Sequence, residues 1–279
     1  MSGALLSFMA MAIGGRELSS ELTTFQILFF RSSLGLVVIA GLLQQAGWRQ
    51  LRTHVLQTHV IRNVTHFGGQ YGWFYGISLI PLTEVFAIEF TVPIWTAILA
   101  TLILGERMTR LRVLAIIMGF VGILVILRPG AAIVGAGALA VLGSAMAYAF
   151  SHVFTKRLSA TETPLCILFY MTVIQLPLGL VPAIPHWVWP SVRLYPWIAT
   201  VALTALSAHY CLTRAFRLAD ASVVIPMDFL RLPLIALVGF FFYHEPLQSW
   251  VFAGAAIVFV AIWLNLKSAR AASAAEVRA

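Results

Sequence analysis

Long apolar segments fill most of the chain, and short polar or proline-containing breaks separate them. A helix that spans a bilayer needs about 20 mainly apolar residues. Ten segments approach or reach this length, and the first is the shortest. The pattern therefore predicts an all-α polytopic membrane protein. Its predicted spanning helices cover residues 1–16, 24–46, 61–80, 82–104, 111–128, 134–156, 163–184, 196–217, 221–243 and 248–267.

The composition agrees with a membrane protein and excludes a soluble enzyme, a disordered chain and a coiled coil. Hydrophobic residues make up 61% of the chain and charged residues 10%, against about 45–50% and about 25% in soluble domains. A net charge of +8 would suggest nucleic acid as the partner of a soluble protein, but no basic run is long enough here. Membrane lipid is the expected partner, because basic loops favour the anionic cytoplasmic leaflet.

No cofactor and no metal is expected from the sequence. Only two cysteines are present, Cys166 and Cys211, and both lie inside apolar segments. The histidines and cysteines do not have the spacing of a zinc site. Glycine pairs such as Gly14-Gly15 do not fit a phosphate-binding loop.

Lys and Arg are distributed unevenly between the two sets of loops. If the N-terminus is inside, the inner segments carry thirteen of these residues and the outer segments three. Arg31 and Arg231 lie within predicted helices. Because cytoplasmic loops hold the excess of basic residues in membrane proteins, both termini are predicted to be cytoplasmic.

The two halves of the chain align at an offset of 139 residues, which relates Glu106 at the end of the fourth predicted helix to Glu245 at the end of the ninth. Five helices per half is an odd number, so the second half must cross the membrane in the opposite sense, as in many secondary transporters. A chance match between apolar helices is the alternative. The predicted units are a first repeat over residues 1–130, an inverted repeat over 131–267 and a cytoplasmic tail over 268–279.

Small residues recur at intervals that bring them to one helix face. Gly68, Gly72 and Gly76 lie four residues apart, and the repeat pairs Gly122 with Ala261. Small residues on one face let helix backbones approach closely. These positions are therefore predicted to pack tightly against neighbouring helices.

The chain combines ten predicted helices in two repeats with three short motifs, Phe29-Phe30-Arg31, Pro93 and Leu104-Gly105-Glu106. In these features it resembles EamA-type transporters of the drug/metabolite transporter superfamily, over essentially its whole length. It looks most like bacterial exporters of aromatic and other amino acids. The second half departs from the family pattern, because His244-Glu245 replaces Gly-Glu. The resemblance implies a multi-pass protein of the bacterial inner membrane and a structural role for Glu106 and Glu245 as caps of neighbouring helix ends.

Four charged residues are functional candidates because they lie well inside predicted helices, where charges are costly and often functional. Arg31 and Glu89 lie at matching depths, which allows an ion pair. Asp228 is the repeat partner of Glu89, and Arg231 follows it by three residues, which allows a pair on one helix face. One interpretation is gating, substrate recognition or proton coupling. The other is two buried ion pairs that fix helix register.

A second set of residues combines aromatic rings with polar groups. Rings with polar tips suit a cavity that stacks an apolar substrate and offers hydrogen bonds, and amides and imidazoles do not comfortably face lipid. The alternative is packing and hydrogen bonding between helices. The predicted cavity residues are His66, Gln70, Tyr71, Tyr75, Trp95, Tyr148, His209 and Tyr210.

The function predicted from the sequence is secondary transport, not catalysis. The protein would export small metabolites, and the expected substrates are amino acids, including aromatic ones. Export would proceed by alternating access through a central cavity between the repeats. With no nucleotide-binding motif, transport must be facilitated or coupled to an ion, with protons as the candidate. The alternatives are exchange of nucleotide sugars or sugar phosphates, a channel, and a membrane enzyme. An enzyme is disfavoured because the repeat places Glu89 and Asp228 at opposite depths.

Overall fold

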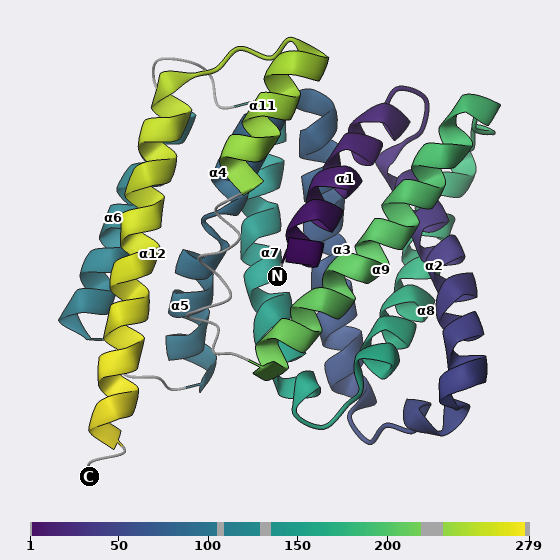
Figure 1. Cartoon of the computed structure of the whole chain (residues 1–279), viewed down its shortest axis with the longest axis horizontal. Coiled ribbons are helices and arrows are strands. Elements are labelled where there is room, and N and C mark those ends of the chain that lie inside the picture. Colours follow the sequence, from purple (N-terminus) through teal and green to yellow (C-terminus); the bar gives the residue numbers. More distant parts are fainter. Residues whose placement is uncertain (1, 105–108, 129–134, 219–230, 277–279) are drawn as a thin grey trace.

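The computed structural model describes residues 2–104, 109–128, 135–218 and 231–276 (Figure 1). Within these residues the regular structure is helical throughout. Short 3₁₀ turns occupy Trp48–Leu51, Ile184–His186 and Val192–Leu194. The α-helices are α1 (Ser2–Leu18), α2 (Thr24–Ala46), α3 (Leu56–Leu79), α4 (Leu82–Glu89), α5 (Val92–Leu104), α6 (Arg110–Leu127), α7 (Ala136–Ser159), α8 (Pro164–Ala183), α9 (Tyr195–Leu218), α11 (Arg231–Tyr243) and α12 (Ser249–Glu276).

Most helix bounds match the predicted segments, and α2 coincides with residues 24–46. Its start is defined by a capping box, in which the Thr23 hydroxyl accepts from the Gln26 N–H and the Gln26 side chain accepts from the Thr23 N–H. In the predicted helix 221–243, only Arg231–Tyr243 falls within the described residues.

The predicted helix 82–104 is wrong as a single helix, because it is broken into α4 and α5. Pro93 has no N–H for the Glu89 carbonyl, and its ring crowds that group. Thr91 covers the break, since its hydroxyl donates to the Ile88 carbonyl at 2.7 Å. The break leaves Glu89 at the end of a helix inside the protein.

The helices associate in pairs that join the two halves of the chain. α1 packs along α9, α2 along α8, α3 along α7 and α6 along α12. Figure 1 shows the α6–α12 pair at one side of the molecule and the α2–α8 pair at the other, with α1, α3 and α7 between them. Neither half therefore forms a separate body.

Two helix pairs are close because glycines face a neighbouring backbone. A Cβ on Gly72 would lie 2.5 Å from the Ala140 carbonyl oxygen of α7. Gly122 and Gly254 meet across the α6–α12 pair, where each added Cβ would lie within 2.9 Å of the other residue's carbonyl oxygen. Gly68 does not belong to this contact face, because a Cβ there would meet nothing within 4 Å.

This difference along α3 gives a matched test. Gly72→Ala is expected to lower the stability of the detergent-solubilised protein by about 1–3 kcal/mol, because overpacking against a backbone cannot be relieved by a rotamer change. Gly68→Ala is expected to raise stability by up to about 1 kcal/mol, since Ala favours a helix over Gly. Thermal unfolding of both variants measures this difference. Equal midpoints would contradict the tight α3–α7 contact.

Length and hydropathy identify three described helical stretches as long enough to cross a membrane, namely Thr24–Ala46, Ala136–Ser159 and Pro164–His186. Shorter apolar helices are Val113–Leu127, Leu234–Tyr243 and Ser249–Leu264. Large apolar side chains are exposed, among them Leu102 at 74% and Phe242 at 77%. Apolar surface of this kind is stable when lipid covers it. The described residues thus have the features of a multi-pass membrane protein.

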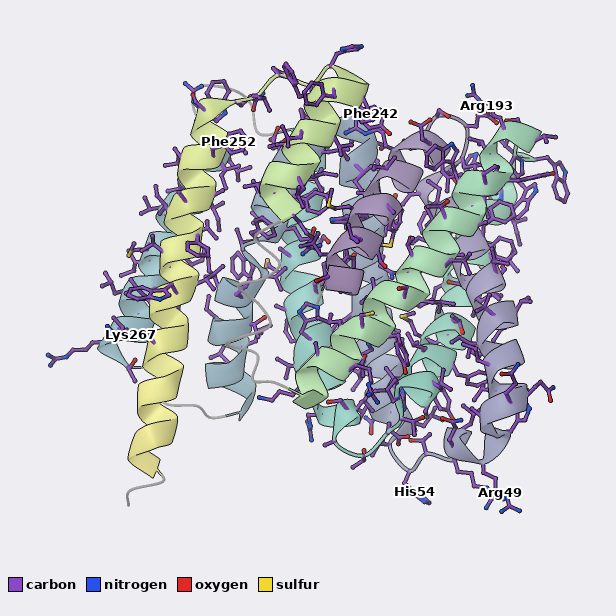
Figure 2. The ribbon with its side chains drawn as sticks, viewed as in Figure 1. Arg49, His54, Arg193, Phe242, Phe252 and Lys267 are labelled. Carbon is purple, nitrogen blue, oxygen red and sulfur yellow. The ribbon has the colours of Figure 1, made fainter. Side chains whose placement is uncertain are left out.

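Contacts between loops connect segments that are distant in sequence. Figure 2 shows Arg193 at one end of the molecule and Arg49 and His54 at the other. At the Arg193 end, Glu21 accepts from the Ser191 hydroxyl at 2.9 Å and from its N–H at 3.2 Å, and pairs with Arg193 at 3.1 Å. The Ser191 hydroxyl, more than the other groups, holds the pKa of the Glu21 carboxyl below its ordinary value. Glu21 therefore stays charged at neutral pH.

Glu245 connects three segments at the same end. It accepts a hydrogen bond from the Leu82 N–H at 2.9 Å and pairs with Arg16 at 3.1 Å. Leu82 is the first residue of α4, so the carboxylate caps that helix and matches the positive end of its dipole. The predicted capping role is confirmed for Glu245, while Glu106 lies outside the described residues.

Candidate functional site

Six buried polar side chains from four helices gather inside the protein, and we call them the buried polar cluster. None of them is more than 9% exposed. Buried polar groups of this density are costly unless they are hydrogen-bonded or serve a ligand. The cluster consists of Arg31 on α2, Arg62, Asn63 and His66 on α3, Gln175 on α8 and His209 on α9.

Gln175 is the centre of the hydrogen bonds in this cluster. Its Oε1 accepts from Arg31 Nη1 at 3.3 Å. Its Nε2 donates to the Asn63 carbonyl at 3.2 Å and lies 2.9 Å from His66 Nδ1. Because an amide NH₂ group only donates, His66 Nδ1 is the acceptor and the ring proton of the neutral imidazole lies on Nε2. One amide thus fixes both the Arg31 side chain and the tautomer of His66.

Aromatic rings surround the two histidines. The His66 and His209 ring centroids are 4.8 Å apart, and His66 lies 5.5 Å from the Tyr148 ring. Phe8 of α1 contacts His209 edge-on at 5.8 Å. Tyr148 is held on its other side by Gly69, where an added Cβ would lie 2.8 Å from the ring. The structure therefore brings together His66, Tyr148 and His209, three of the predicted cavity residues.

Several hydrogen-bonding groups at this site have no partner among the described residues. They are Nε and Nη2 of Arg31, Nδ2 of Asn63 and Oε1 of Gln70. A buried group without a partner costs about 1–3 kcal/mol, and more when it is charged. Gln70 lies one helical turn from His66, on the same side of α3. The cluster therefore offers donors to a bound molecule, and Gln70, one turn from His66 on α3, offers an acceptor.

Arg62, the second arginine of the cluster, already has hydrogen-bond partners. Arg62 Nε donates to the Thr155 hydroxyl of α7 at 3.1 Å, and Arg62 Nη1 donates to Asn63 Oδ1 at 2.6 Å. Arg31 and Arg62 together make the cluster cationic, because neither of them pairs with a carboxylate in the described part of the chain. An anionic group is the ligand that this charge favours.

Glu89 forms a separate contact near α1, α3 and α11. Its Oε2 accepts from Trp73 Nε1 at 2.8 Å, and its Oε1 lies 3.6 Å from Arg231 Nη1. The Arg231 guanidinium lies 4.8 Å from the Phe8 ring centroid and 5.3 Å from that of Phe86. Both charged side chains are largely buried, at 13% and 4% exposure.

The predicted pairing of Arg31 with Glu89 is wrong. Arg31 bonds to Gln175, whereas Glu89 pairs with Arg231. The break after Glu89 is the physical reason, because it ends α4 and α4 packs against α11 at this place. Asp228 lies outside the described residues, so its predicted pairing with Arg231 stays a prediction.

The remaining aromatic residues of the predicted set make other contacts or are exposed. Tyr71 and Tyr75 stack on each other with 6.0 Å between centroids, and Phe25 covers Tyr71 at 4.6 Å. Trp95 Nε1 donates to Thr91 Oγ1 at 3.1 Å, and its ring packs edge-on against Phe120. Tyr210 is 40% exposed.

The sequence did not single out Arg62, Gln175 or Thr155, which form hydrogen bonds at the site. Arg62 falls near the start of a predicted helix and was counted with the loop residues. Gln175 is a lone amide in an apolar helix, and an isolated polar residue at such a position is a signal of function in its own right.

A polytopic helical fold and a buried polar cluster with hydrogen-bonding groups that the described residues leave unpaired are features of a membrane transporter of small molecules. The model of the EamA-like transporter family matches residues 1–128 and 135–267, so the chain belongs to that family. Family members and the relatives named below are transporters, so this protein is a metabolite transporter and not an enzyme.

The chain is similar to several curated transporters over most of its length. It is 26% identical to an S-adenosylmethionine uptake transporter of Rickettsia prowazekii (strain Madrid E), covering 91% of this chain and 87% of the relative. It is 30% identical to a riboflavin transporter of Vibrio cholerae serotype O1, covering 85% and 83%. It is 28% identical to a pseudopaline exporter of Pseudomonas aeruginosa (strain UCBPP-PA14), covering 92% and 91%.

A solved structure, titled only as a crystal structure of a protein, has the same fold. It matches 96% of this chain and 98% of its own with a TM-score of 0.67, at 16% sequence identity.

Proposed function

We propose that the protein is a secondary transporter of small metabolites that carry a carboxylate. These metabolites include amino acids, aromatic amino acids among them. The buried polar cluster is the substrate site, and the substrate reaches it by alternating access through a central cavity between two inverted repeats. One observation carries this proposal: the buried Arg31 guanidinium is held by a neutral amide and has two nitrogens without a partner in the described structure.

The helix pairing supports the inverted repeat. Suppose that α1, α2 and α3 correspond to α7, α8 and α9. Exchanging the two halves of the chain then turns the α3–α7 pair into the α9–α1 pair and leaves the α2–α8 pair unchanged. The caps agree with this correspondence, because Thr23 starts α2 and Thr163 starts α8 by accepting from a backbone N–H three residues on. A repeat of this kind lets each half adopt the conformation of the other. Cytoplasmic termini stay part of the proposal, on the distribution of Lys and Arg.

The chemistry of the cluster matches an amino acid. The free side of the Arg31 guanidinium suits a carboxylate, which accepts two parallel hydrogen bonds. Gln70 Oε1 is an acceptor for the ammonium group. Tyr148 and His209 present ring faces or edges to an aromatic side chain.

Sugar phosphates and nucleotide sugars are the second candidate class. Arg31 and Arg62 lie in one cluster, and two guanidinium groups favour a phosphate. The hydrogen bonds of Arg62 to Thr155 and Asn63 leave less of it available, which favours the carboxylate. The relatives are named for S-adenosylmethionine, riboflavin and pseudopaline, so these molecules also belong in any substrate panel.

Flux into liposomes that contain the purified protein tests the proposal. The panel is radiolabelled Phe, Trp, Thr, Met, S-adenosylmethionine, riboflavin, pseudopaline and a sugar phosphate, each with and without a pH gradient. We expect saturable flux of the substrates with a carboxylate, and no flux in protein-free liposomes. Preferred flux of riboflavin or of the sugar phosphate over every amino acid would overturn the amino-acid assignment.

A further inference from the structure

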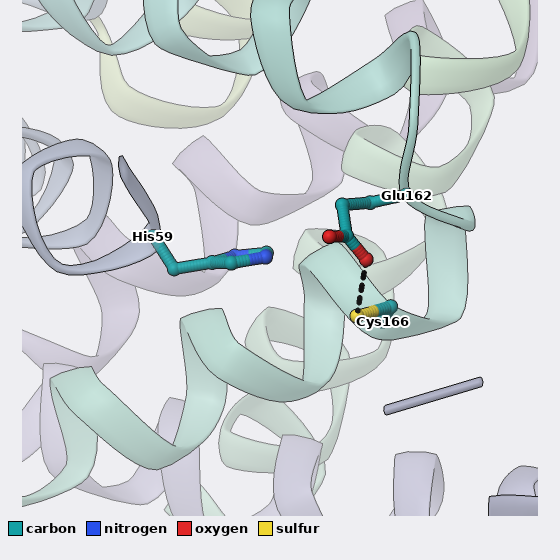
Figure 3. Close-up of side chains that lie close together, drawn as sticks. All are labelled: His59, Glu162 and Cys166. Carbon is teal, nitrogen blue, oxygen red and sulfur yellow. Dashed lines mark hydrogen bonds between the residues drawn. The ribbon is translucent and has the colours of Figure 1, made fainter. Parts of the chain in front are cut away.

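Three side chains that bind transition metals in many proteins meet near the Arg49 end of the molecule, about one helical turn along α3 from Arg62 of the buried polar cluster. His59 lies near the start of α3, Glu162 in the connection between α7 and α8, and Cys166 in the first turn of α8 (Figure 3). One ligand atom from each lies within 4.8 Å of the other two, and all three residues are buried. We call them the His59 site.

The imidazole of His59 has no hydrogen-bond partner at either ring nitrogen among the described residues, although the residue is 0% exposed. Figure 3 shows its ring pointing toward Glu162. Tyr170 packs on the ring at 4.4 Å and is itself held by a hydrogen bond to the Leu51 carbonyl. A buried imidazole with two unmet groups is costly. The ring is thus fixed in place with a lone pair to offer.

The other two groups are oriented by hydrogen bonds. Cys166 Sγ donates to Glu162 Oε2 at 3.2 Å, and Thr53 Oγ1 donates to Glu162 Oε1 at 2.7 Å. The contact between the Cys166 thiol and the Glu162 carboxylate is slightly shorter than the spacing of two ligands on one ion, so a small outward shift would accommodate a metal. In a tetrahedral zinc site, ligand atoms lie about 3.3–3.8 Å apart, given metal–ligand distances of about 2.0–2.3 Å.

We propose that His59, Glu162 and Cys166 bind a divalent cation of the zinc class, with a fourth position for water or a solute group. A thiol, an imidazole and a carboxylate suit zinc, whereas calcium and magnesium prefer a shell of oxygen atoms. Binding replaces the S–H bond of Cys166 with a metal–sulfur bond. The proton passes to Glu162 and leaves to solvent, so no oxidant or reductant is needed.

The position of the site gives the ion a structural effect. His59 belongs to the first half of the chain, and Glu162 and Cys166 belong to the second. Thr163 adds a further link beside it by donating to Gln50 Oε1 at 2.7 Å. A bound ion therefore cross-links the two halves at this end. Sequence spacing does not predict the site, because His59 is far from the other two ligands along the chain.

Cobalt titration of the full-length protein in detergent, after removal of metals by a chelator, tests this inference. We expect one Co²⁺ per chain, with a thiolate-to-cobalt charge-transfer band that Zn²⁺ abolishes by displacement. Cys166→Ala is expected to remove the band and to weaken cobalt binding by more than about 100-fold. Loss of a residue that only supports a metal ligand weakens binding by at most about 100-fold. Cys211→Ser, at the other cysteine, is expected to change neither.

Thermal unfolding provides a second measurement. Zn²⁺ is expected to raise the unfolding midpoint of the wild-type protein and of Cys211→Ser, because an ion that binds only the folded state stabilises it. Cys166→Ala and Glu162→Gln are expected to show no rise. If Cys166→Ala binds cobalt as tightly as the wild-type protein, or if the wild-type spectrum has no thiolate band, the site does not exist.

Discussion

Arg31→Met is expected to reduce flux of a carboxylate substrate by at least about 100-fold while the yield of folded protein stays near that of the wild type. Two charge-assisted hydrogen bonds contribute about 1.5–3 kcal/mol each, and about 1.4 kcal/mol corresponds to a factor of ten. Stability is maintained because, among the residues that the structure describes, Arg31 forms only one hydrogen bond, to Gln175 at 3.3 Å. Replacing a buried charge with an apolar side chain removes its desolvation cost.

Liposome flux of Arg31→Met and Arg31→Lys measures this effect. Lys keeps the charge and loses the planar pair of donors, so we expect it to raise KM more than it lowers the maximal rate. Arg193→Met is the matched control, because its ion pair with Glu21 is exposed and such pairs contribute about 0–1 kcal/mol. If Arg31→Met transports with the KM of the wild type, Arg31 has a structural role only.

The hydrophobic pattern predicted the positions of the helices well, because a helix that crosses lipid needs a long apolar segment whichever helices it packs against. The bounds of α2 follow from that rule and from the Thr23 cap. The break between α4 and α5 was missed, although Pro93 was recognised as part of a motif. Apolar residues continue on both sides of the break, so hydropathy does not register it, and only the missing N–H of the proline signals it.

The site was predicted in part. His66, Tyr148 and His209 do meet, because polar and aromatic groups inside apolar helices turn toward protein. Their partners were not predictable in the same way. Whether Arg31 meets Glu89 or Gln175 depends on the rotation of α2 against α3 and α8, and matching depth along the helices does not determine rotation.

Removing either partner of the Glu89–Arg231 pair is expected to destabilise the protein by about 3 kcal/mol, and removing both is expected to restore most of this loss. A broken buried pair costs about 3–5 kcal/mol, since the remaining charge stays in a site of low polarity. The lower value applies because Glu89 keeps 13% exposure. Glu89→Gln retains an acceptor for Trp73 Nε1, which donates to Glu89 in the native protein.

Thermal unfolding of Glu89→Gln, Arg231→Met, the double variant and the wild type measures the coupling between the two residues. Met keeps the apolar contact of Arg231 with Phe8 and Phe86. Glu84→Gln, on the same helix, is the control for loss of a carboxylate in α4. Losses that simply add in the double variant would contradict the pair.

Flux through the same four proteins separates a coupling role from a structural one. If Glu89 carries the proton, the double variant regains stability and yet its flux does not respond to a pH gradient, because Gln cannot exchange a proton. If the pair only fixes α11 against α4, the double variant regains both stability and the wild-type response to the gradient. Comparing the double variant with the wild-type protein therefore distinguishes the two interpretations, because these proteins differ in charge and are expected to share one fold.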